Sequence, residues 1–113
     1  MEISSEARDN IVWIKISGRM VIDASLFRLR EHVLYGLESG IQTFVIDISE
    51  VSHLDSSGCG EVISVHTSIQ RAKGSLVFVN PTERIRILWT HTRLNEVLNI
   101  FNTLDEARDF IRR

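Results

Sequence analysis

Residues 44–60 read FVIDISEVSHLDSSGCG, and this stretch indicates the fold class more clearly than any other. It begins with a short β-branched run, Phe44–Ile48, which predicts a strand covered on both faces. A loop is expected over Ser49–Asp55, and a helix from about Ser57 to Lys73, closed by Gly74. The inward face of that helix is expected to carry Cys59, Val62, Ile63, His66 and Ile69. A buried strand followed by an amphipathic helix indicates a layered α/β fold.

The N-terminal third continues the pattern of short strands and amphipathic helices. The segment before the Asp9-Asn10 turn signal is mixed, but residues 11–17 after it alternate as a half-buried strand does, which predicts a β-hairpin that Gly18 breaks. A helix is expected to begin at about Asp23, a suitable N-cap, and to end at Gly40, a suitable C-terminal cap. A hairpin and a helix therefore precede the central strand.

The C-terminal half adds two further pairs of a strand and a helix. Strands are predicted at Leu76–Val79 and Val97–Phe101. Asn80 is the expected N-cap of a helix over Pro81–Thr90, and Thr103 begins a capping box for a terminal helix. We therefore expect an α/β fold, a single domain over residues 1–113, with a mixed sheet of four to five strands and about four helices.

Composition and charge disfavour several classes of function. The 113 residues include 13 Lys and Arg against 15 Asp and Glu, a formal net charge of −2. The basic residues Arg84, Arg86 and Arg93 are interrupted by acidic and apolar residues, so nucleic acid is not an expected partner. The single cysteine cannot form an internal disulfide, and the sequence has neither a secretion signal nor a run of about 18 apolar residues. These features predict a cytoplasmic protein without direct membrane insertion.

Two serines, Ser56 and Ser57, lie between Asp55 and Gly58 at a predicted helix start. A serine there can serve simply as the N-cap, because its hydroxyl bonds the free amides of the first turn. The same amides, with the positive end of the helix dipole, would also stabilise a phosphate. Gly58 and Gly60 would leave room for the backbone of a partner. The pattern therefore fits either a capped helix or a phosphorylatable serine at the carboxyl edge of the sheet.

On these residues, the chain resembles STAS-domain proteins of the bacterial anti-sigma factor antagonist type. The resemblance extends over essentially the whole chain. Its specific part is Val45–Ile48 with Val51, Leu54 and residues 55–58, DSSG, which are similar to the phosphorylation motif of the family. Weaker support comes from residues 76–81, LVFVNP, and from Leu94, Glu106 and Ala107.

The resemblance implies a function by partner switching and no enzymatic activity of the chain itself. It implies that Ser56, or as second choice Ser57, is phosphorylated by an anti-sigma factor that is itself an ATP-using serine kinase. A PP2C-type phosphatase would remove the phosphate. The unphosphorylated protein would capture the anti-sigma factor and free a sigma factor, and the phosphorylated protein would release it. The expected partner-binding residues are Asp23, His53, Asp55, Ser57, Gly58 and Gly60.

Three positions depart from the family pattern. An acidic residue is usual shortly after the glycine of the second strand, but Val21 stands there, so either Asp23 substitutes for it or that partner contact is lost. Cys59 replaces the usual leucine and is interpreted as a small core residue. His53 is atypical and is expected to tune the choice of partner.

Other functions fit the sequence less well. A hydrolase would use Ser56 or Ser57 as nucleophile, with His53 or His66 as base and Asp47 or Asp55 to orient the base. The nucleophile elbow of such enzymes, Gly-x-Ser-x-Gly, needs a glycine before the serine, and no glycine precedes these serines. The four histidines, His32, His53, His66 and His91, lie on separate predicted elements, so neither a metal nor a cofactor is expected.

The remaining alternative uses the same domain differently. It is a phosphorylation-independent scaffold or subunit of a stressosome-type or lipid-transport-type assembly. The free protein is expected to be a monomer. Trp13 and Trp89 are interpreted as core or boundary residues, with residues 89–93 a further candidate for the partner surface.

Overall fold

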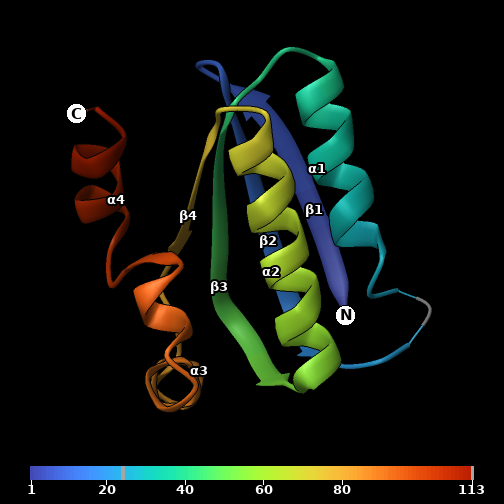
Figure 1. Cartoon of the computed structure of the whole chain (residues 1–113), viewed down its shortest axis with the longest axis vertical. Coiled ribbons are helices and arrows are strands. Elements are labelled where there is room, and N and C mark those ends of the chain that lie inside the picture. The colour runs from blue at the N-terminus through green and yellow to red at the C-terminus, as the bar shows by residue number, and fades with distance from the viewer. Residues whose placement is uncertain (24, 113) are drawn as a thin grey trace.

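A computed structural model describes residues 1–23 and 25–112, and Figure 1 shows their arrangement. The strands are β1 (Glu2–Arg8), β2 (Ile11–Met20), β3 (Thr43–Leu54), β4 (Ser75–Val79) and β5 (Asn99–Phe101). The helices are α1 (Arg28–Glu38), α2 (Ser56–Arg71), α3 (Glu83–His91) and α4 (Leu104–Ile111), with a short 3₁₀ helix, η1, at Leu94–Glu96. The strands form one sheet in the order β1-β2-β3-β4-β5, in which β1 and β2 are antiparallel and the other pairs are parallel. The predicted α/β fold with a mixed sheet is confirmed.

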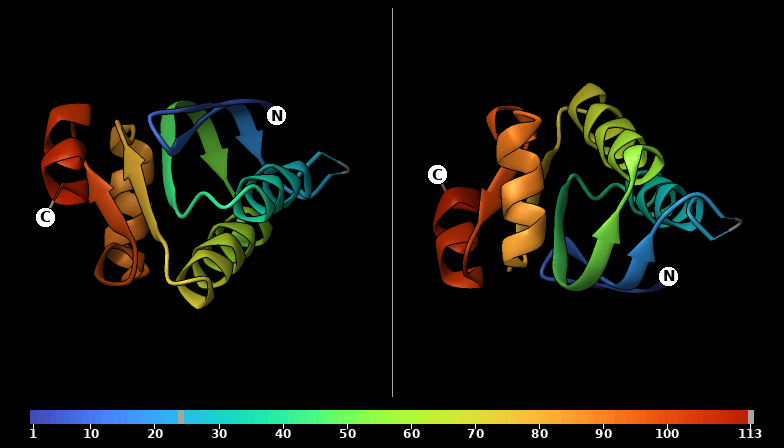
Figure 2. Two further views of the ribbon diagram at one scale, coloured as in Figure 1. Left: turned by 90° about the horizontal axis from the view of Figure 1, so that it is seen from above. Right: turned by 90° about the horizontal axis from the view of Figure 1, so that it is seen from below.

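The sheet has two differently covered faces, because side chains alternate along each strand. Even-numbered residues of the central strands, such as Ile14, Ile46 and Phe78, are buried in the larger core together with residues of α1, α2 and α3. Odd-numbered residues, such as Val45 and Val77, form a smaller cluster with α4. Figures 1 and 2 show α1 and α2 side by side and α4 on the opposite side of the molecule. In the described part of the chain, no helix combines the length and the apolar character needed to cross a membrane.

Two strands are longer than the sequence predicts. Gly18 does not end β2, which continues to Met20 through shifts in register, with Gly18 in the left-handed region at φ +91°. This continuation pairs with the segment predicted as a loop, so β3 does not end at Ile48 but extends to Leu54. The added segment buries Val51 and exposes Ser52, as expected for a strand with one covered face.

Helix starts differ from the sequence prediction at two places. The helix α1 begins at Arg28 instead of near Asp23, whose carboxylate accepts hydrogen bonds from the amide and hydroxyl of Ser25 in the preceding turn. The cap of α3 is Thr82, which accepts from the Ile85 amide at 3.2 Å, and Asn80 instead has a left-handed backbone at φ +58°. In both cases a local turn competes with the predicted cap.

The structure confirms some of the other predicted helix boundaries and corrects one predicted inward position. Gly40 follows α1 with φ +86°, and Thr103 caps α4 by accepting from the amide of Glu106, as predicted. After α2, the left-handed residue is Lys73, at φ +61°, which directly precedes Gly74. The predicted inward position of Ile63 is wrong, because this side chain is 39% exposed.

Candidate functional site

Asp55 organises the edge of the sheet at which β3 leads into α2. Its backbone is extended, and its Oδ1 accepts a hydrogen bond from the Gly58 amide at 2.8 Å, which makes Asp55 the N-cap of the helix. Its Oδ2 accepts from the Ile22 amide at 3.1 Å, in the segment that follows β2. The carboxylate therefore holds the start of α2 and the end of β2 together.

These hydrogen bonds change the acidity of Asp55. Hydrogen bonding by the Gly58 amide, opposed by some desolvation and supported by the Ile22 amide, holds the pKa of Asp55 below its ordinary value of 3.8. The carboxylate thus contributes a fixed negative charge beside the two serines at neutral pH.

Neither serine is the N-cap of α2. Ser56 is the first residue of α2 and is exposed, whereas Ser57 is half-buried. The interpretation of either serine as the N-cap is wrong, because Asp55 occupies that position. The Ser56 hydroxyl therefore lies at the positive end of a 16-residue helix, but it does not cap that helix.

The two glycines have different surroundings. Gly58 is buried, and a Cβ added there would lie 2.2 Å from the Met20 carbonyl oxygen, so this glycine allows α2 to pack on the end of β2. The expectation that Gly58 opens space for a partner is corrected on this ground. Gly60 is exposed, and nothing lies within 4 Å of an added Cβ. Only Gly60 presents the open surface that the sequence suggested.

Substitution of these glycines by alanine is expected to have opposite effects. Gly58→Ala places a methyl group against the Met20 carbonyl and should lower the free energy of unfolding by about 2 kcal/mol. Gly60→Ala, in the same helix with open space around it, should raise the free energy of unfolding by about 0.5–1 kcal/mol. Chemical denaturation of both variants measures the difference. Equal stability of the two variants would contradict the packing role of Gly58.

The charge of Asp55 is expected to affect stability at acidic pH. Because its pKa is lower in the folded chain than the ordinary 3.8, its contribution is complete above that value. The contribution is lost as pH falls from 3.8 through the folded-state pKa. Asp55→Asn keeps a capping side chain but removes the titrating group. We therefore expect thermal stability to fall less steeply in the variant than in the wild type over this acidic range, and superimposable curves would contradict it.

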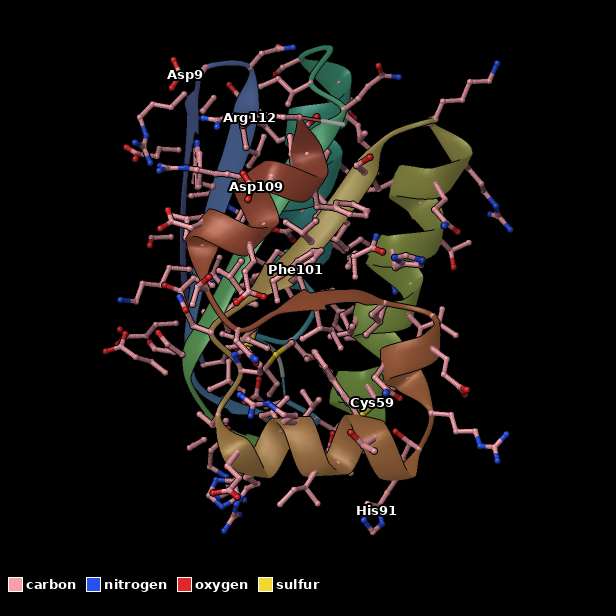
Figure 3. The ribbon with its side chains drawn as sticks, turned by 90° about the vertical axis from the view of Figure 1, so that its left-hand side faces the viewer. Asp9, Cys59, His91, Phe101, Asp109 and Arg112 are labelled. Carbon is pink, nitrogen blue, oxygen red and sulfur yellow. The ribbon has the colours of Figure 1, made fainter. Side chains whose placement is uncertain are left out.

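An apolar groove of about 470 Å³ lies beside Ser56, between the first turns of α2 and the segment from α3 to η1. It is lined by Leu54, Asp55, Ser56, Cys59, Gly60, Ile63, Leu88, Thr92 and Leu94. Figure 3 shows Cys59 close to α3, whereas His91 points away from the body of the protein. Burial raises the pKa of the Cys59 thiol, which agrees with its interpretation as a packing residue.

The other predicted partner residues lie at the same edge or close to it. His53 is exposed near the end of β3, with its Nδ1 3.1 Å from the Ser52 hydroxyl. Asp23 is exposed and follows Ile22, whose amide binds Asp55. Hydrogen bonding by the Ser25 hydroxyl lowers the pKa of Asp23, so it adds a second carboxylate near the start of α2.

In the described part of the chain, the residues of the hydrolase alternative are not joined into a triad. His66 is only 4% exposed on the inner side of α2, and burial lowers its pKa. Asp47 accepts from the Ser49 amide and lines a different cavity, of about 310 Å³, next to α4. Across the described residues, no hydrogen bond joins a histidine to Ser56 or Ser57, and no cluster of three His, Cys, Asp or Glu residues could hold a metal.

Sequence reasoning missed two contacts near this edge. One is the Ile22 amide, whose bond to Asp55 joins residues 33 positions apart. The other is an ion pair between α1 and α2, in which the Arg30 Nη2 donates to Oε1 of the buried Glu61 at 2.6 Å. The only sequence signal for the ion pair is the position of Glu61 three residues after Gly58, on the inward stripe of the helix.

Comparisons with known proteins agree with this architecture. The anti-sigma-B factor antagonist of Listeria monocytogenes is 30% identical over 73 residues, which are 65% of this chain and 63% of the relative. An anti-sigma factor antagonist from Mycobacterium paratuberculosis matches at a TM-score of 0.80 and 23% identity, over 99% of this chain and 96% of the other. The Bacillus cell fate determinant SpoIIAA in its phosphorylated form matches at 0.72 and 21% identity, over 97% and 99% of the two chains.

The family model for the STAS domain matches residues 2–107. This match includes the five strands, the edge at Asp55 and Ser56, and the first turn of α4. Because it covers nearly the entire sequence, the chain belongs to the STAS domain family.

Proposed function

We propose that this chain is an anti-sigma factor antagonist whose binding to its anti-sigma factor is switched off by phosphorylation of Ser56. The observation that carries the proposal is the division of roles between neighbouring residues: Asp55 caps α2, and Ser56 is left exposed at the first helical position. Phosphorylation of a serine that capped the helix would cost the hydrogen bond of the cap. Ser56 does not cap α2, so its phosphorylation does not have this cost.

The charge of the phosphate explains the switch. A phosphoserine carries about −1.5 to −2 charges, and the helix N-terminus favours that charge within the free protein. At an interface, the same group would lie beside the Asp55 carboxylate and would have to lose its water, which costs several kcal/mol. Phosphorylation therefore weakens the complex without unfolding the domain.

The proposed partner surface consists of exposed and half-buried residues of this edge. It includes Asp23, His53, Ser57 and Gly60, with Asp55 supplying charge, while Gly58 acts through packing. The names of relatives support a partner of this class, since the Listeria protein is called an anti-sigma-B factor antagonist. Support for phosphorylation comes from SpoIIAA, a protein of the same fold whose structure is known in a phosphorylated form.

The partner is proposed to be an anti-sigma factor that transfers the γ-phosphate of ATP to the Ser56 hydroxyl. The serine loses its proton, ADP leaves, and a PP2C-type phosphatase later hydrolyses the phosphoserine. The chain itself is a binding protein and a substrate, acting in the cytoplasm, and carries out no catalytic step.

Affinity capture with and without ATP tests this function. The chain, tagged at its C-terminus, is incubated with lysate of the native organism, and bound proteins are identified by mass spectrometry. We expect the wild type to retain an anti-sigma factor without ATP and to release it with ATP, while Ser56→Ala retains it in both conditions. Equal retention by the wild type in both conditions would contradict the switch.

A further inference from the structure

The strand β1 leaves one edge of the sheet open. In the described part of the chain, β1 pairs only with β2, and all its residues are exposed except the half-buried Ile3. The pairing runs through seven consecutive residues without a shift, from Glu2 to Arg8. Native edge strands commonly avoid further pairing by proline, a bulge, short length or charged side chains, and of these β1 has only the charged side chains of Glu2, Glu6 and Arg8. Figure 2 shows this strand along the margin of the molecule.

The hairpin turn determines which backbone groups of β1 point outward. The two-residue turn at Asp9 and Asn10 has positive φ at both positions, so its flanking residues Arg8 and Ile11 form a hydrogen-bonded pair. Counted back from Arg8, every second residue of β1 also exchanges backbone hydrogen bonds with β2. The amides and carbonyls of the remaining three residues, Ile3, Ser5 and Ala7, therefore point away from the sheet.

The sequence of β1, EISSEAR, is complementary to itself in one antiparallel register. When two copies pair about a two-fold axis at Ser5, Glu2 of each copy lies opposite Arg8 of the other. In the same register Ser4 lies opposite Glu6, and Ile3 opposite Ala7. The three outward-pointing residues face one another, which gives about six backbone hydrogen bonds.

Neighbouring registers lack this complementarity. With the axis at Ser4, Glu2 would face Glu6, and with the axis at Glu6, the two copies of Glu6 would face each other. Like charges directly opposite destabilise a strand pair. Registers with the axis between residues would match outward-pointing groups with inward-pointing ones.

We propose that β1 is a self-association surface, through which two copies of this chain join their sheets antiparallel about an axis at Ser5. The occupant of the edge is a second copy because the charges of the strand complement those of an identical strand. The proposed dimer differs from the free monomer expected from the sequence. Because β2 separates β1 from β3, the groove beside Ser56 is not part of the paired edge, so each copy keeps its own proposed partner site.

A charge exchange tests the register. Sedimentation equilibrium is measured over a wide concentration range on the full chain with a free N-terminus. Arg8→Glu sets like charges opposite and should raise the dissociation constant of the dimer by about tenfold or more. The double variant Glu2→Arg/Arg8→Glu restores opposite charges between copies and should return the constant to within about threefold of the wild type. It does not restore the pair between Arg8 and Glu6 within one chain, so rescue reports the contact between copies.

A backbone substitution tests the edge itself. Ala7→Pro removes an outward-pointing amide without removing a bond to β2 and should abolish the dimer, whereas the matched control Ala7→Ser should keep it. Circular dichroism confirms that both variants fold. A wild type that stays monomeric throughout, a dimer insensitive to Ala7→Pro, or a double charge variant that fails to restore association would each overturn the proposal.

Discussion

Ser56→Asp is expected to weaken binding of the anti-sigma factor by roughly a hundredfold, which corresponds to about 3 kcal/mol. The substituted carboxylate lies next to Asp55, so the partner must cover two adjacent negative charges where it otherwise covers one. Ser56→Ala should bind within about threefold of the wild type, because the hydroxyl caps nothing. Calorimetric titration of the purified partner measures all three affinities, and equal affinity of the Asp and Ala variants would contradict the switch.

The stability of these variants provides the control. Since Asp55 supplies the cap, Ser56→Ala and Ser56→Asp should both unfold within about 0.5 kcal/mol of the wild type. A carboxylate in the first turn also suits the helix dipole. Loss of binding without loss of stability would separate the charge effect from damage to the fold.

Trp89→Ala is expected to lower the free energy of unfolding by about 3–5 kcal/mol. This side chain is 1% exposed and contacts Phe78 edge to face, with ring centroids 5.3 Å apart. Trp89 is therefore a core residue, and the sequence-based candidate surface over residues 89–93 is limited to its exposed residues 90–93, of which Thr92 lines the groove.

The matched control for Trp89 lies in the same helix. Ile87 is 51% exposed, and Ile87→Ala should change the free energy of unfolding by less than about 0.5 kcal/mol. Urea denaturation of both variants measures the contrast. A Trp89→Ala variant as stable as Ile87→Ala would show that the tryptophan does not hold α3 on the sheet.

Much of the fold could be predicted because period and turn chemistry are local. The Asp9-Asn10 turn signal and the alternation after it predicted the hairpin, and the β-branched run Phe44–Ile48 predicted the central strand. The extension of β3 to Leu54 could not be predicted, because it depends on pairing with Met20, more than thirty residues earlier. Likewise, Asn80 and Asp23 have the chemistry of caps, and only the tertiary path of the chain decides that they serve in turns.

The candidate site divides in the same way. Its location at a strand end before a helix followed from topology, which brings Asp55, Ser56 and Gly60 to one edge. The choice of Asp55 over the adjacent serines as cap was open, since all three side chains can accept from helix amides. The buried contact of Gly58 with Met20 joins two distant segments, and a glycine in the sequence does not reveal what approaches it.

The measurement that tests the central claim most directly is phosphosite mapping of the wild type, Ser56→Ala and Ser57→Ala after incubation with the purified partner and ATP. The account predicts one phosphate on Ser56 in the wild type and in Ser57→Ala, and none in Ser56→Ala. Phosphate on Ser57 alone would support a phosphorylation switch but would show that its assignment to Ser56 is wrong. A partner that binds stably while all three proteins stay unphosphorylated would contradict the account and favour the phosphorylation-independent scaffold.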